Sequence, residues 1–231
     1  MRIYVVLFVA MLTWWPVTPS FADALVADGV KVDLKIPEGY CSLSRDHPAE
    51  KPHYDQQDRM QAKINAVMLI ALPCEEIADA RAGRPWKRWV IWLLNGPPGH
   101  HTKIPPNMTR QVVTEQLAHA MPTVDIDTIG KDIGGVAAKE GLGIKLHTMS
   151  MIGKDDVALY TAQAAKVSRG DAGREIAVVT GWVAMGGRLF TANTYADLEG
   201  VATVEGLLAQ AKTIIKSSAD SSDVLNSEGT K

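Results

Sequence analysis

Two adjacent histidines, His100 and His101, are the first candidates for chemistry in this sequence. They lie in the stretch NGPPGHHTKIPPN, residues 95–107, where four prolines and two glycines surround them. Imidazole nitrogens bind transition metals, and a bound metal can activate water for hydrolysis. Neighbouring side chains diverge in extended backbone, so a metal site would need a distant third ligand, such as His119, His147 or a carboxylate. One alternative is therefore a metal-assisted hydrolase.

The same loop has two interpretations that involve no catalysis. The G-P-P-G stretch before the histidines favours a turn, which would leave the imidazoles in solvent. The loop can also be a contact surface for a partner, because a proline-rich loop loses little conformational freedom on binding. Pro97, Pro98, His100 and His101 are the candidate interaction residues, and the two histidines are also the candidate metal ligands.

The common catalytic motifs are missing from the sequence. It contains no G-x-S-x-G nucleophile elbow, no H-E-x-x-H zinc motif and no glycine-rich phosphate loop. The acidic stretch DIDTIGKDIGG lacks the spacing of an EF-hand calcium loop. We therefore expect a non-catalytic protein without a cofactor, which binds a small ligand or a protein partner.

The first residues have the layout of a secretory signal peptide. Arg2 precedes an apolar run, and small residues follow it up to Ala22 and Ala24. This run is shorter than the roughly 20 residues that a membrane span needs. Residues 1–22 are therefore the predicted signal peptide, with an uncleaved membrane anchor as the alternative. We expect a periplasmic or secreted protein, without stable membrane insertion once the signal is cleaved.

Length and charge predict one ordinary domain. The chain has 231 residues and a formal net charge of −2. Such a mildly acidic chain lacks the basic surface that nucleic-acid binding requires. We expect a single domain over residues 23–217, large enough for a hydrophobic core. The segment 218–231 is rich in Ser and Asp, and its composition predicts a disordered tail.

Cys41 and Cys74 are the two cysteines of the chain. In an oxidising compartment two thiols within one domain tend to pair. A disulfide between them would stabilise the fold by about 3–4 kcal/mol in the chain-entropy model. The alternative is two separate buried thiols. The cysteines are too few for a structural zinc site and too far apart for a redox C-x-x-C pair.

Periodicity predicts a mixed order of strands and helices. Strands are expected at residues 30–36, 66–72, 86–94, 143–153, 156–167 and 174–197, the last turning at the M-G-G-R stretch as a hairpin. Helices are expected at residues 54–64, 74–83, 108–121, 125–141 and 203–219. The late run of strands before a terminal helix predicts an α+β fold, with helices on both faces of a mostly antiparallel sheet (an α/β/α sandwich).

The tryptophan-rich stretch at 86–94 predicts a central strand. Alternation divides its apolar side chains into two sets, Trp89, Ile91 and Leu93 on one face and Val90, Trp92 and Leu94 on the other. Because both faces are apolar, the strand should be covered on both sides. The tryptophans are accordingly interpreted as core residues rather than as a sugar-binding platform.

The chain resembles the PsbP-like family over about residues 28–217. The likeness rests on an opening strand that runs into IPEGY, a run of strands that ends in GRLFTANTYAD, and a closing amphipathic helix. The long insert between Asn95 and Gly141 departs from the family pattern. The resemblance implies an α/β/α sandwich and no shared catalytic constellation. It also implies an exported binding or accessory protein.

Overall fold

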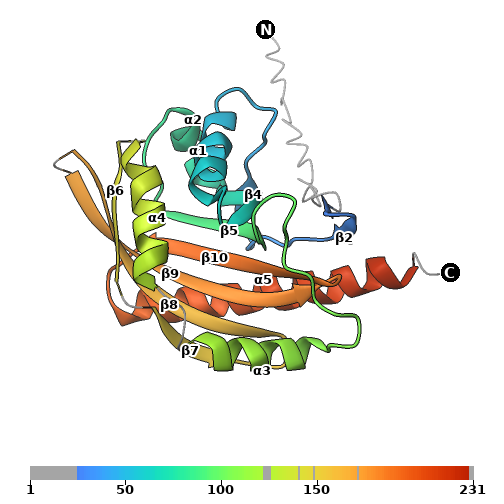
Figure 1. The fold of residues 1–231 in the computed structure, drawn as a ribbon. Coiled ribbons are helices and arrows are strands. Elements are labelled where there is room, and N and C mark those ends of the chain that lie inside the picture. Colours follow the sequence, from blue (N-terminus) through green and yellow to red (C-terminus); the bar gives the residue numbers. More distant parts are fainter. Residues whose placement is uncertain (1–24, 122–125, 140, 148, 171, 229–231) are drawn as a thin grey trace, which may run out of the picture.

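The computed structural model describes residues 25–121, 126–139, 141–147, 149–170 and 172–228 (Figure 1). Its main feature is an antiparallel sheet with the strand order β3-β4-β5-β10-β9-β8-β6, in which β7 also pairs with β8. These strands are β3 (Tyr40–Ser42), β4 (Asn65–Pro73), β5 (Arg88–Asn95), β6 (Gly143–Leu146), β7 (Ser150–Lys154), β8 (Ala158–Arg169), β9 (Ala172–Met185) and β10 (Arg188–Asp197). The predicted signal peptide, residues 1–22, lies outside the described residues.

Helices cover both faces of this sheet, so the predicted α+β fold class is confirmed. The helices are α1 (Lys51–Gln61), α2 (Ile77–Arg81), α3 (Arg110–Ala120), α4 (Ile126–Lys139) and α5 (Val201–Glu228), and the short 3-10 turn η1 (Cys74–Glu76) precedes α2. Helix α5 runs along one face and contacts β8, β9 and β10, whereas α1 and α4 contact β4 and β6 and meet each other across the opposite face (Figure 1). No helix in the described ranges is long and apolar enough to cross a membrane.

Strand β5 is central, as its alternating pattern predicts. It lies between β4 and β10, and its side chains from Trp89 to Leu94 are all buried. Val90, Trp92 and Leu94 join the core beneath α5. The other set, Trp89, Ile91 and Leu93, faces α1 and α2. Period-two alternation thus supplies both layers of the sandwich from one strand.

Two turns show how the predicted strands are divided. Gly186 and Gly187 both have positive φ, at 54° and 72°, and they close the hairpin between β9 and β10 as predicted. The predicted strand at 143–153 is instead two short strands, β6 and β7. Both pair with β8, and the amide of His147 after β6 also donates to the Ala164 carbonyl of β8 at 2.9 Å.

The opening strand is shorter than its alternation predicts. Residues 25–32 form a small hairpin of β1 (Leu25–Ala27) and β2 (Val30–Val32). Beyond Val32 the backbone pairs with helix α5 rather than with a strand. The amide of Asp33 donates to Ser222 Oγ at 3.1 Å, and the amide of Lys35 donates to Ser218 Oγ at 2.8 Å.

These contacts also correct the prediction of a disordered tail over 218–231 for its described residues, 218–228. Helix α5 continues to Glu228, and Ser218, Ala219 and Ser222 are fully buried. The serine hydroxyls satisfy backbone donors of a segment more than 180 positions earlier in the chain. A Ser-rich composition predicts disorder only when no distant segment supplies partners, and here the segment after β2 does so.

The predicted disulfide between Cys41 and Cys74 is confirmed. Cys41 lies in β3, and Cys74 follows β4 directly, so antiparallel pairing of these strands brings their Cα atoms to 4.9 Å. The bond fastens the edge strand β3 to the sheet. It lies on the outer side of β4, away from β5 and the strands beyond it.

Candidate ligand pocket

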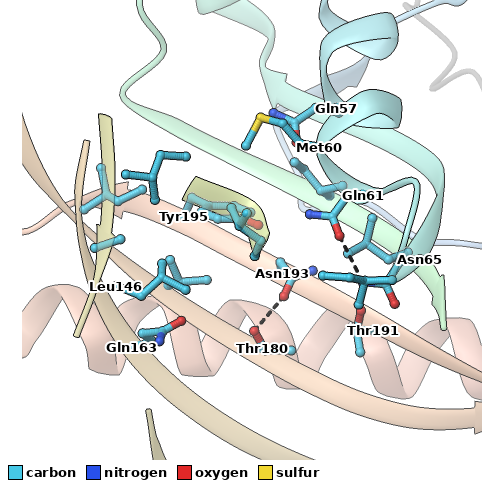
Figure 2. A pocket seen from close by; sticks show the side chains of 18 of the residues that line it. Gln57, Met60, Gln61, Asn65, Leu146, Gln163, Thr180, Thr191, Asn193 and Tyr195 are labelled. Carbon is cyan, nitrogen blue, oxygen red and sulfur yellow. Dashed lines mark hydrogen bonds between the residues drawn. The ribbon is translucent and has the colours of Figure 1, made fainter. Parts of the chain in front are cut away.

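A pocket of about 310 Å³ lies on the sheet face opposite α5. Its floor is formed by β5, β10, β9, β8 and β6, and its walls by α1 and by Ile133 of α4. Figure 2 shows Gln57, Met60 and Gln61 of α1 on one side of the hollow, with β10 and β9 beneath. The pocket therefore lies between the sheet and the two helices that meet above it.

Alternation along the strands determines which side chains reach the pocket. Strand β10 contributes Thr191, Asn193 and Tyr195, whereas the intervening Phe190, Ala192 and Thr194 are buried on the α5 side. Strand β9 contributes alternate residues in the same way, namely Arg174, Ile176, Val178, Thr180 and Trp182. The floor is thus mostly apolar, with a polar patch where β10 and β9 run side by side.

Neutral amides and hydroxyls supply most of the pocket's polar groups, and several are held by hydrogen bonds. Thr180 Oγ1 donates to Asn193 Oδ1 at 2.6 Å on the floor (Figure 2). At the α1 wall, Asn65 Nδ2 donates to Gln61 Oε1 at 3.0 Å. On β8, Gln163 Nε2 donates to the carbonyl of His147 at 2.7 Å. These bonds fix the orientation of the amides around the hollow.

Arg174 is the charged residue among the described side chains that line the pocket. Its guanidinium donates to Asp197 at 2.9 Å and to the Trp86 carbonyl, and it lies 5.5 Å from the centre of the Trp89 ring. The carboxylate neutralises this cation at the rim. The remainder of the lining carries no formal charge at neutral pH.

Tyr195 packs against Trp89 in the pocket wall. The two rings are stacked, with centroids 4.7 Å apart and planes 7° from parallel. Burial raises the pKa of the Tyr195 phenol, so it stays protonated at neutral pH. Tyr195 therefore offers the pocket a flat apolar ring and a neutral hydroxyl.

The chemistry of this lining suits binding. Among the described residues around the pocket there is no Asp, Glu, His, Cys, Ser or Lys. A hydrolase needs a nucleophile or an activated water with a base beside it. Apolar side chains with a few convergent neutral polar groups are instead typical of sites that hold small ligands.

The histidine loop lies apart from the pocket. His100 is exposed, and His101 is half-buried with its Nδ1 3.0 Å from the carbonyl of Gly96. A side chain at Gly96 would come within 2.5 Å of the His100 carbonyl, so the chain makes a tight turn here. Within the described ranges, no group of three or more His, Cys, Asp or Glu residues is placed to hold a metal. The roles of this loop in metal binding or partner contact stay predictions.

Sequence reasoning did not single out the polar residues of β10. The signal was present in FTANTYA, where Thr191, Asn193 and Tyr195 occupy alternate positions, although Thr194 on the other face is polar as well. Polar groups on one face of a buried strand need partners, and such a pattern indicates either a polar layer or a cavity. Only the tertiary structure shows which side the helices leave open.

Comparison with known proteins adds a likeness of fold. No protein-family model matches the chain, and no curated protein matches it. Among solved structures it is similar to the solution structure of cyanobacterial PsbP (CyanoP) from Synechocystis sp. PCC 6803. The identity is 12%, the TM-score is 0.38, and the match covers 78% of this chain and 83% of that one. The PsbP-like resemblance noted from the sequence is therefore a weak one, at the level of the fold, and no residue's role is carried over from it.

Proposed function

We propose that this protein is an exported, non-catalytic binding or accessory protein, and that it holds a small, uncharged, mainly apolar ligand in the pocket. The observation that carries the proposal is the hollow itself, about 310 Å³ in the middle of a well-packed sandwich. A ligand gains roughly 25 cal/mol for each Å² of apolar pocket surface that it removes from water. A ligand that fills the hollow would recover contacts that the protein alone does not make.

The charge of the lining supports an uncharged ligand. Arg174 is already paired with Asp197, and the other pocket side chains are neutral. A charged ligand would lose part of its hydration in this mainly apolar pocket without gaining a counter-charge, which is unfavourable. Neutral molecules with a large apolar surface avoid this cost.

Export rests on two features. The first is the signal-like leader at residues 1–22, and the second is the disulfide between Cys41 and Cys74. Disulfides persist in oxidising compartments such as the periplasm. The loop with Pro97, Pro98, His100 and His101 is the candidate contact for a protein partner. Pro98 and His100 are exposed, and backbone hydrogen bonds from His100 to Pro97 and from Thr102 to Asn95 close the turn.

The proposal is tested by thermal unfolding of the mature protein with three probes of similar shape. Naphthyl methyl ketone and ethylnaphthalene are uncharged, whereas naphthoate is an anion at neutral pH. We expect the uncharged probes to raise the melting temperature, because ligands that bind only the native state stabilise it. Naphthoate should leave it unchanged.

The matched control is Val178→Phe. Val178 lies on the pocket floor between Tyr195 and Gln163, so a larger ring there occupies the hollow. The variant should fold and lose the response to both uncharged probes. The proposal is wrong if the wild-type protein responds to neither uncharged probe, or if Val178→Phe responds as strongly as the wild type.

A further inference from the structure

Strand β10 places three hydrogen-bonding groups in a row along the pocket floor. Thr191, Asn193 and Tyr195 occupy positions i, i+2 and i+4, so their side chains project from the same face of the sheet. The exposed fractions of Thr191 and Asn193 are 2% and 7%, and Tyr195 is half-buried. Figure 2 shows all three at the hollow, with Asn193 between the other two.

Each of these residues has a polar atom without a protein partner. Within the described part of the chain, no residue hydrogen-bonds to the Thr191 or Tyr195 hydroxyl, and the one side-chain bond of Asn193 is made by its Oδ1. Asn193 Nδ2 is left as an unused donor. In the same part of the chain, every fully buried side-chain nitrogen or oxygen does have a partner. The unpaired groups therefore reach the open space of the pocket.

The three groups share the ability to donate. Asn193 Nδ2 can only donate, and the two hydroxyls are free to turn their hydrogens toward a ligand. The Tyr195 phenol is protonated at neutral pH, and burial raises its pKa further above its usual alkaline value. A ligand that fills the pocket displaces water from these donors. A ligand that accepts their hydrogen bonds therefore gains more than one that leaves them unpaired.

We infer that the ligand carries oxygen acceptors of the carbonyl, ester or ether type along one edge of an otherwise apolar body, and that Thr191, Asn193 and Tyr195 recognise that edge. This inference rests on the proposed function, since it names the ligand class of the same pocket. Alternate residues of a strand are about 6.6 Å apart, so the row spans about 13 Å. Acceptors along that length can meet one, two or all three donors, while Ile91, Leu93 and Val178 contact the apolar body.

The test compares naphthyl methyl ketone with ethylnaphthalene, which has nearly the same shape but lacks the carbonyl oxygen. Binding is measured by titration calorimetry on the wild-type protein and on the double variant Thr191→Val, Tyr195→Phe. Both substitutions keep the shape of the side chain and leave no protein group unpaired. We expect the double variant to bind the ketone about tenfold more weakly, which corresponds to about 1.4 kcal/mol, and the hydrocarbon with unchanged affinity.

A control on the same strand separates recognition from stability. Thr194 lies on the opposite face of β10, where its hydroxyl contacts the carbonyls of Val179 and Leu207 at 3.2 and 3.3 Å. Thr194→Val should lower the melting temperature and leave the affinities for both probes unchanged. If the double variant is poorly folded, Tyr195→Phe alone gives the same comparison, because its ring keeps the stacking with Trp89.

The outcomes distinguish the two proposals. If the wild type binds both probes and the double variant weakens neither, or weakens both equally, the inference about acceptors is wrong and the binding function stands. If the wild type binds neither probe, the proposed function fails, and the inference fails with it. If the double variant loses affinity for the ketone but not for the hydrocarbon, the result supports both the binding function and the inference about acceptors.

Discussion

The two faces of the central sheet are built from the same strands, yet one is sealed and the other is hollow. On the α5 face, Trp92, Phe190 and Ile215 are fully buried in one core. On the pocket face, alternate residues of the same strands border about 310 Å³ of open space. Strand alternation therefore decides which side chains face each layer, and the covering helices decide whether that layer is filled.

The covering helices differ in how closely they approach the strands. Helix α5 is 28 residues long and lies so near β9 that a Cβ added at Gly181 would be 2.0 Å from Ile215 Cδ1. Helices α1 and α4 have 11 and 14 residues and contact mainly β4 and β6, toward the two edges of the sheet. The pocket lies between these two helices and the strands β5, β10, β9 and β8.

The largest expected difference between the faces comes from equal truncations. Ile215→Ala removes a fully buried side chain from the α5 core, and we expect it to lower the free energy of unfolding by about 2–5 kcal/mol. Ile144→Ala removes the same atoms from the half-buried pocket wall, where they already border a cavity, and should cost less than about 1.5 kcal/mol. Urea unfolding of both variants checks this difference, and equal losses would remove the distinction between the faces.

Enlarging a side chain should give the same contrast on one strand. Gly181→Ala forces Ile215 and the Tyr160 ring to move, and we expect a loss of about 1–3 kcal/mol. Val178→Phe, on the opposite face of β9, places its extra atoms in the pocket and should change stability by less than about 1 kcal/mol. Denaturant midpoints measure both effects. A larger loss for Val178→Phe than for Gly181→Ala would mean that the pocket is not open in solution.

We expect low pH to destabilise the pocket side of the fold by protonating Glu50, the residue immediately before α1. Burial acts to raise the pKa of this carboxyl, but hydrogen bonds from the Ser44 amide and the Arg81 guanidinium outweigh it and lower the pKa below its usual value. The pKa of Glu50 is therefore lower in the folded protein than in the unfolded chain, where it is about 4.3. Glu50 contributes its full stabilisation at pH values above the unfolded-state pKa. This contribution is lost as the pH falls through the folded-state pKa.

Glu50→Gln tests this acid sensitivity. At neutral pH the variant should be less stable by about 1–2 kcal/mol, a modest figure because Arg81 is half-exposed. Between about pH 6 and about pH 3 the wild type should lose more stability than the variant. Hydrogen exchange of α1 amides follows the change, and α5 amides serve as the internal reference. Parallel acid profiles for the two proteins would show that Glu50 does not hold this side of the fold.

Local pattern predicted much of the architecture. The alternation in β5, the glycine turn between β9 and β10, and the pairing of Cys41 with Cys74 all follow from residue types and spacing. These features depend on neighbours in the chain or on chemistry that is independent of the fold. The Ser-rich end of α5 was misjudged because its stability comes from contacts with residues 33–35, which no local pattern reveals.

The candidate site was harder to predict for a related reason. The histidine loop has a conspicuous composition, whereas the pocket is assembled from ordinary residues on β5, β6, β8, β9, β10 and α1. A cavity depends on how far two helices stand from a sheet, and this distance has no sequence signature. The alternating Thr191, Asn193 and Tyr195 were the available local clue, since polar residues facing a core need an explanation.

The central claim is that the pocket face is open to receive an uncharged ligand while the α5 face is sealed. The most direct measurement is a fluorescence titration with the neutral dye N-phenylnaphthylamine, comparing the wild type with Val178→Phe. Trp89 and Trp182 line the pocket, so their emission reports the bound dye as well. We expect saturable one-to-one binding by the wild type and its loss in the folded variant. The absence of saturable binding, or equal binding by both proteins, would contradict the account.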